Sequence, residues 1–89
     1  MNKDYSKSYM KALRKKLEKV INGNVSVYMN DYDEIIVEIY VQDFDVHFTF
    51  NAEEPFSNIV IKGFSVEDAA EEITIEYMEF IFEKFFKLQ

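Results

Sequence analysis

Apolar residues recur at helical spacing near both ends of the chain and alternate with polar residues in between. The first helix is predicted for residues 4–22, where apolar side chains fall three or four positions apart: Met10, Leu13, Leu17, Val20 and Ile21. Basic side chains take the other side of this helix: Lys7, Lys11, Arg14, Lys15 and Lys19. Gly23 follows the last apolar position, and we expect it to close the helix in the left-handed conformation.

Two strands are predicted next, at residues 25–30 and 34–42, because apolar and polar residues alternate there. The residues expected to face the core are Val25, Val27, Met29, Ile35, Val37, Ile39 and Val41. The other face is mixed, with Ser26, Tyr28, Ile36, Glu38 and Tyr40. Between the strands, residues 30–33 read Asn-Asp-Tyr-Asp, which is typical of a turn because these side chains bond their own backbone.

The alternation then changes parity, since Phe44, Val46, Phe48 and Phe50 are apolar at even positions. A strand cannot change parity without a turn or a bulge. We therefore expect a tight turn at Gln42–Asp43 that makes a hairpin, with one long bulged strand as the alternative. Residues 51–58 are expected to form a loop, and residues 57–62 a short fourth strand with Ile59 and Ile61 inward.

The last helix is predicted for residues 65–88, with Ser65 as its N-cap and acids in its first turn. One face of this helix is apolar along its length: Val66, Ala69, Ala70, Ile73, Tyr77, Phe80, Ile81 and Leu88. A second apolar stripe lies on the far side: Ile75, Met78, Phe82, Phe85 and Phe86. A helix docked on one sheet needs only one apolar stripe. The second must meet the first helix, a second copy of the chain or a partner.

These elements predict an α+β fold in a single domain, residues 1–89. A helix, a three- or four-stranded antiparallel sheet and a long C-terminal helix form two layers, with both helices on one face of the sheet. The other sheet face carries polar and aromatic side chains together with His47 and Thr49. We expect that face to meet solvent.

Charge is distributed unevenly along the chain. Residues 1–24 hold seven Lys or Arg and two acids, whereas residues 25–89 hold three Lys and fifteen acids, which together give the net charge of −7. Such a surface repels phosphates and attracts basic surfaces. The chain has no Cys, starts with polar and charged residues and contains no run of membrane-spanning length. We expect a cytoplasmic protein that binds neither membrane nor nucleic acid directly.

The residues that carry chemistry do not form a catalytic or metal-binding motif. His47 is the only histidine and stands on a strand face without a nucleophile motif beside it. The carboxylates of residues 31–34 are not accompanied by the glycine and the distant glutamate that a calcium loop requires. The chain has two glycines, which are too few for a phosphate-binding loop. We therefore expect a non-enzymatic protein without a cofactor or a metal.

Two acidic turns, Asp31-Tyr32-Asp33-Glu34 and Gln42-Asp43-Phe44-Asp45, flank a strand that carries Glu38. With its small size, net acidity and order of elements, the chain resembles the phage-encoded anti-CRISPR proteins that inhibit Cas9, although its basic first helix departs from them. The resemblance implies an inhibitor that acts in the cytoplasm of a bacterial host cell, mimics DNA and occupies a basic nucleic-acid-binding cleft, in a Cas9-type nuclease for example. The partner-binding residues would be Asp31, Asp33, Glu34, Glu38, Asp43 and Asp45, with Tyr28 and Tyr40 as apolar anchors. The alternative is a homodimer or other homo-oligomer that pairs through the second stripe of the last helix.

Overall fold

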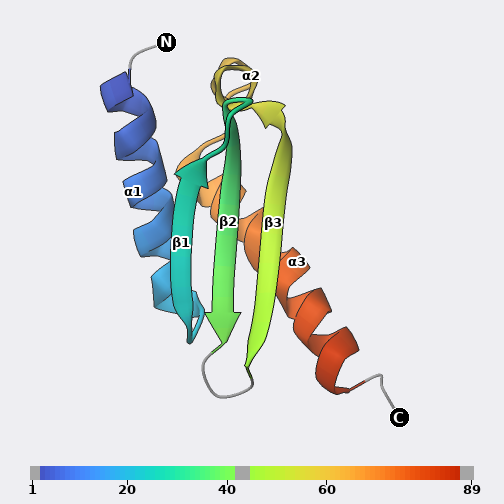
Figure 1. Cartoon of the computed structure of the whole chain (residues 1–89). Helices are drawn as coiled ribbons and strands as arrows, with labels where there is room; N and C mark the ends of the chain where they lie inside the picture. The colour runs from blue at the N-terminus through green and yellow to red at the C-terminus, as the bar shows by residue number, and fades with distance from the viewer. Residues whose placement is uncertain (1–2, 42–44, 87–89) are drawn as a thin grey trace.

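The computed structural model describes residues 3–41 and 45–86, with the backbone alone at residues 3–5. The elements are α1 (Lys3–Val20), β1 (Asn24–Met29), β2 (Glu34–Val41), β3 (Val46–Pro55), α2 (Phe56–Ile61) and α3 (Val66–Phe85). The strands form one antiparallel sheet in the order β1-β2-β3 (Figure 1). The α+β fold expected from the sequence is confirmed.

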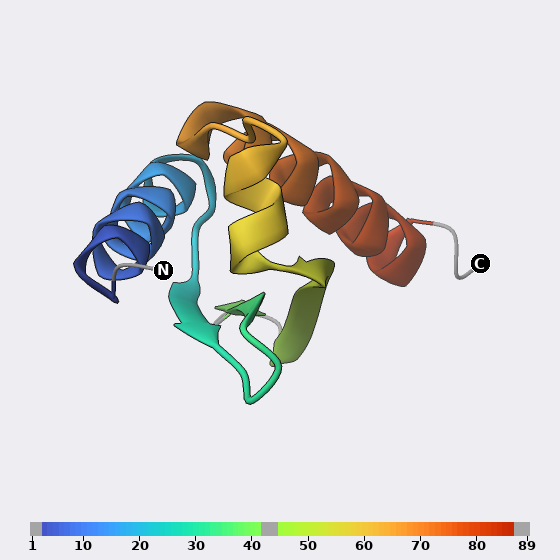
Figure 2. The ribbon, with the colours of Figure 1, turned by 90° about the horizontal axis from the view of Figure 1, so that it is seen from above.

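Helices α1, α2 and α3 lie on one side of the sheet, as the view along the strands shows (Figure 2). The core between the two layers has Leu13 and Leu17 from α1, Val37 and Ile39 from β2, and Ile73 from α3, each at most 2% exposed. Burying a side chain of this size contributes about 1.5–3 kcal/mol. The residues of β2 predicted to face inward are all buried, but Ile36, predicted on the other face, is buried as well.

The parity change after β2 marks a hairpin. Val41 pairs with Val46 and Ile39 with Phe48, so β2 and β3 are two antiparallel strands, and one long bulged strand is wrong. The predicted turn itself, together with Phe44, lies outside the described residues.

The predicted fourth strand, residues 57–62, is wrong, because this segment forms helix α2. Phe56 and Ile59, three positions apart, are buried, whereas Ile61 is 80% exposed, which excludes inward alternation. The helix ends as its sequence suggests. Gly63 has φ +81°, and the amides of Gly63 and Phe64 donate to the carbonyls of Val60 and Ile59, which is a Schellman motif.

The predicted loop at residues 51–58 is wrong as well, because β3 continues to Pro55. Its pairing with β2 is irregular there. Ile36 pairs with Asn51 and Glu34 with Pro55, so β3 uses more residues than β2 over the same interval. The extra residues form a bulge, which explains why the sequence loses its alternation at Ala52, Glu53 and Glu54.

Gly23 is not in the left-handed region expected of it, since Gly63 is the described glycine with positive φ. A Cβ at Gly23 would lie 2.6 Å from the carbonyl oxygen of Tyr40. Glycine is required here because the chain passes close to β2 on its way from α1 to β1.

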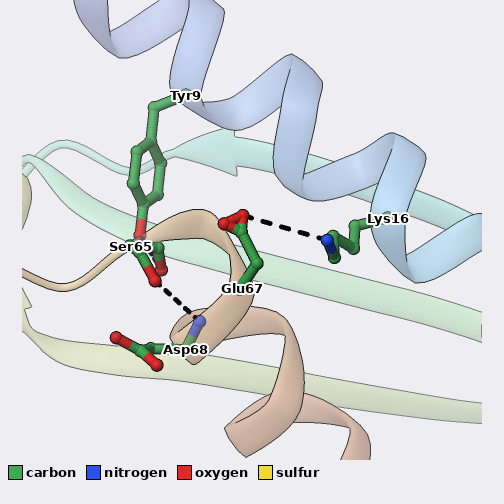
Figure 3. Close-up of polar contacts among 5 residues, drawn as sticks. All are labelled: Tyr9, Lys16, Ser65, Glu67 and Asp68. Carbon is green, nitrogen blue, oxygen red and sulfur yellow. Dashed lines mark hydrogen bonds and ion pairs between the residues drawn. The ribbon is translucent and has the colours of Figure 1, made fainter.

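The start of α3 is fixed against α1 by polar contacts (Figure 3). The Ser65 side chain accepts a hydrogen bond from the Asp68 amide at 3.0 Å, which confirms the predicted N-cap. The Tyr9 hydroxyl donates to the carbonyls of Phe64 and Ser65, each at 3.3 Å. Lys16 lies 3.8 Å from Glu67 in an exposed ion pair.

Candidate functional site

The acidic residues predicted to bind a partner do not form one cluster. Asp31 and Asp33 lie in the β1–β2 turn and Glu34 begins β2, whereas Asp45 lies at the opposite end of β2, just before β3 (Figure 1). Since β2 has eight residues, roughly 24 Å separate the two ends. Asp43 lies outside the described residues. The described carboxylates predicted to bind one partner therefore do not gather at one end of the hairpin, because successive turns of an antiparallel sheet alternate between its ends.

The open sheet face brings three of the predicted residues together. Tyr28, Glu38 and Tyr40 are neighbours there, and Ser26, Glu38, Tyr40 and the exposed His47 line a shallow hollow. Ile36 on this face is buried, between Tyr28 and Asn51 in the register. This face is therefore less exposed to solvent than the sequence pattern predicted.

Two tyrosines on this face engage the carboxylates. The Tyr28 hydroxyl donates to Glu38 at 3.0 Å, and the Tyr40 hydroxyl donates to Asp45. Each hydrogen bond to a carboxylate raises the pKa of its phenol above the usual value, with smaller contributions from desolvation and the nearby negative charge. These pairs give Glu38 and Asp45 a role within the fold.

The acids of the two turns also have local roles. Asp33 and Asp45 adopt positive φ, 60° and 52°, a conformation that Asp tolerates better than most residues. The Asn30 side chain accepts from the amides of Tyr32 and Glu34 and donates to the Glu34 carboxylate. Turn chemistry therefore explains why these residues occur where they do, and their contact with a partner stays a prediction.

The second apolar stripe of the last helix is not buried against α1, which was one of the three covers expected. Four of its members are exposed: Ile75 by 50%, Met78 by 63%, Phe82 by 57% and Phe86 by 67%. We call these four residues the α3 outer stripe. Phe85, predicted to belong to it, instead packs partly buried against the core.

The α3 outer stripe points away from the core because the opposite side of α3 is already engaged. Tyr77 and Phe80 pack on Phe48 of β3, with ring centroids 5.7 and 5.3 Å apart. Beyond this contact, α3 continues past the sheet (Figure 1). Phe82 and Phe86 lie one turn apart with ring centroids at 5.8 Å, so they contact each other. The result is a continuous apolar surface on an exposed helix.

Exposed carboxylates flank this stripe along one side of α3: Asp68, Glu72, Glu76, Glu79 and Glu83. At 100° per residue, Glu72 and Glu76 fall between the stripe and the side that faces β3. Among the described residues, neither of these two carboxylates has an ion-pair partner. The outer face of α3 is thus both apolar and negatively charged.

Sequence reasoning missed a cleft of about 440 Å³ between β3, α2 and α3. Its floor is apolar, with Leu13, Ile35 and Ile73, and its other lining residues include the acids Glu53, Glu54, Glu72 and Glu76. Lys62 forms an ion pair with Glu54. The signal that the sequence offered was the acidic face of α3. The cleft stayed hidden because residues 51–62 were expected to form a loop and a strand.

A search of the described part of the chain finds no group of three or more His, Asp or Glu side chains able to hold a metal ion. No helix among these residues is both long and apolar enough to cross a membrane.

Comparisons of the chain with protein-family models, with curated proteins and with solved structures found no match in any of the three.

Proposed function

We propose that this protein is a non-enzymatic binding module whose α3 outer stripe docks on a basic protein surface with an apolar depression. The observation that carries the proposal is the exposure of four large apolar side chains on one face of α3, on the side away from the sheet. Large apolar groups gathered on a helix face are typical of protein-binding surfaces.

The carboxylates beside the stripe favour a basic partner over a second copy of the chain. In an antiparallel pairing of two α3 helices, a two-fold axis would bring the acidic flanks of both copies to the same side of the interface. Like charges there oppose association, whereas Lys and Arg on a partner would be attracted to Glu72, Glu76 and Glu79. The homo-oligomer of the sequence analysis remains the alternative, and the oligomeric state distinguishes the two.

The experiment compares two variants that each replace an exposed apolar residue with glutamate. Phe82→Glu lies in the α3 outer stripe, whereas Val20→Glu lies at the end of α1 and is 66% exposed in the parent chain. The immobilised protein captures partners from a bacterial lysate at low salt. We expect the captured proteins to be lost with Phe82→Glu and kept with Val20→Glu. Equal capture by both variants removes the stripe from the interface, and a stable dimer in light scattering favours self-association.

A basic nucleic-acid-binding cleft is one surface of this kind, as in an anti-CRISPR-like inhibitor that mimics DNA. The supporting observation is the acidic row of α3: Asp68, Glu72, Glu76, Glu79 and Glu83. Carboxylates four residues apart on a helix rise about 6 Å along its axis. The row therefore presents regularly spaced negative charges, as the phosphate backbone of a DNA strand does.

This second candidate has its own test, which is the cleavage of target DNA by a Cas9-type nuclease with and without the protein. Inhibition that is relieved by Glu72→Gln combined with Glu76→Gln supports it. Unchanged cleavage at protein excess removes the nuclease as a partner but leaves docking through the α3 outer stripe standing.

A further inference from the structure

We propose a second binding site, separate from the α3 outer stripe: the open edge of β3, together with the cleft beside it, takes up an extended lysine- or arginine-bearing peptide segment of a partner as a fourth strand. The cleft shares Glu72 and Glu76 with the acidic flank of α3 but contains no residue of the α3 outer stripe, so Phe82→Glu distinguishes the two sites. The first supporting observation is that, among the residues that the structure describes, β3 lies at the edge of the sheet and pairs with β2 alone.

The two edge strands of the sheet pack against different helices. β1 packs against α1 (Figure 1). β3 contacts α2 and α3 on its inner face. Apart from its ladder with β2, Val46–Glu54 forms no backbone hydrogen bond with another described segment of the chain. An edge strand of this length offers a row of amides and carbonyls for an added strand.

The cleft lies where the edge of β3 comes close to α2 and α3. Five consecutive residues of β3, Phe50 to Glu54, line one side of the cleft, and α3 lines another with Ala69, Glu72, Ile73 and Glu76. A peptide paired along β3 would direct alternate side chains toward the helix layer and hence into this space. The volume of about 440 Å³ lies in the range of ligand pockets.

The chemistry of the cleft identifies the side chains that fit. Its floor is apolar, whereas Glu53, Glu72 and Glu76 supply carboxylates. Lysine and arginine combine an apolar stem with a cationic head, so the stem can lie on the floor while the head reaches an acid. A second copy of this chain is a poorer occupant, since β3-to-β3 pairing would join two chains of net charge −7 and bring their bulge acids to the interface.

The test is an NMR titration of the ¹⁵N-labelled protein with a short peptide of alternating lysine and threonine. We expect shift changes and slowed amide exchange along residues 46–54, with shift changes at Ala69–Glu76. Glu72→Gln combined with Glu76→Gln should weaken binding about three- to tenfold, because two exposed ion pairs are lost. Asp31→Asn combined with Asp33→Asn changes the net charge equally at two residues that do not line the cleft, and it should weaken binding less than about twofold.

Two further controls separate this site from its alternatives. A peptide with norleucine in place of lysine keeps the apolar stem and removes the charge, so we expect it to bind at least about tenfold more weakly. Phe82→Glu should leave peptide binding unchanged. The proposal is overturned by the absence of binding, by equal losses in both charge variants, or by shift changes confined to the α3 outer stripe. Protection of β3 amides that grows with protein concentration without peptide would assign the edge to a second copy and likewise overturn it.

Discussion

Helices α1 and α3 pack on the same sheet face but use their surfaces differently. α1 buries one stripe, with Leu13 and Leu17 fully enclosed, and exposes a basic face. α3 buries Ala70 and Ile73 on one side and exposes the four large apolar side chains of its outer stripe on the other. The contrast shows that one stripe is enough to hold a helix to this sheet. The second stripe of α3 therefore needs an explanation outside the fold.

Opposite charge does not explain how the two helices are held together. Among the described residues, Lys16 and Glu67 form the ion pair that joins the two helices, and both side chains are at least half exposed. A pair of this kind contributes about 0–1 kcal/mol. Apolar packing and the two hydrogen bonds from the Tyr9 hydroxyl carry the contact instead, which leaves most carboxylates of α3 available to a partner.

The largest expected effect is the loss of a core leucine from α1. Leu17 is fully buried, so Leu17→Ala leaves a cavity and should lower the free energy of unfolding by about 2–5 kcal/mol. Met78→Ala on the outer side of α3 should change it by less than about 0.5 kcal/mol, because Met78 is 63% exposed. Urea unfolding of both variants measures the difference. Equal losses would break the comparison between the helices.

Gly23→Ala should be the next most destabilising change. The new Cβ would meet the backbone carbonyl of Tyr40 at 2.6 Å, and a backbone atom cannot move aside cheaply. We expect a loss of about 1–3 kcal/mol. Gly63→Ala meets no atom within 4 Å, but it places alanine at φ +81° and should cost about 1–2 kcal/mol. An unchanged melting temperature of Gly23→Ala in thermal unfolding would contradict this account.

Ser65→Ala removes the N-cap of α3 and should cost about 1 kcal/mol, because the Asp68 amide loses its acceptor. Ser8→Ala is a suitable control, since Ser8 is an exposed residue inside α1. We expect the control to be slightly stabilising in chemical denaturation, by about 0.5 kcal/mol or less, because alanine has a higher helix propensity than serine. A neutral Ser65→Ala would mean that the start of α3 is held by its contacts with Tyr9 and Lys16 alone.

The smallest effect concerns alkaline pH. Tyr28 and Tyr40 donate as phenols to carboxylates, so the pKa of each phenol in the folded protein is raised above its value in the unfolded chain. Their contribution to stability is complete below the unfolded pKa, near 10, and is lost as pH rises through the folded value. Phenolate absorbance should show Glu38→Gln lowering the midpoint of one tyrosine. An unchanged titration curve would exclude the Tyr28–Glu38 hydrogen bond in solution.

Much of the fold was predictable from local patterns. Alternation placed β1 and β2, helical spacing placed α1 and α3, and Ser65 marked the start of α3. The segment after Asn51 was not predictable in this way. A bulge interrupts the alternation of β3, and residues 56–61 satisfy both a strand pattern at Ile59 and Ile61 and a helix pattern at Phe56 and Ile59. Burial against the core selects the helix, which local sequence does not specify.

The candidate site was less predictable than the fold, because it depends on which segments come together. The acids of the two turns look like one group along the sequence, yet β2 separates them by its full length. The carboxylates of the cleft come from β3 and α3, which are distant in sequence. The second stripe of α3 could be identified from the sequence, but predicting its exposure would have required knowing where α1 lies relative to α3.

The central claim, that the α3 outer stripe is not needed for the fold, is tested most directly by urea unfolding of the double variant Met78→Glu with Phe82→Glu at low and high protein concentration. The account predicts a free energy of unfolding within about 1 kcal/mol of the parent chain at both concentrations, because both side chains already meet solvent. A loss of about 3 kcal/mol or more at both concentrations would show that the stripe belongs to the core of the monomer. A loss that appears at high concentration alone would show that it holds two copies of the chain together.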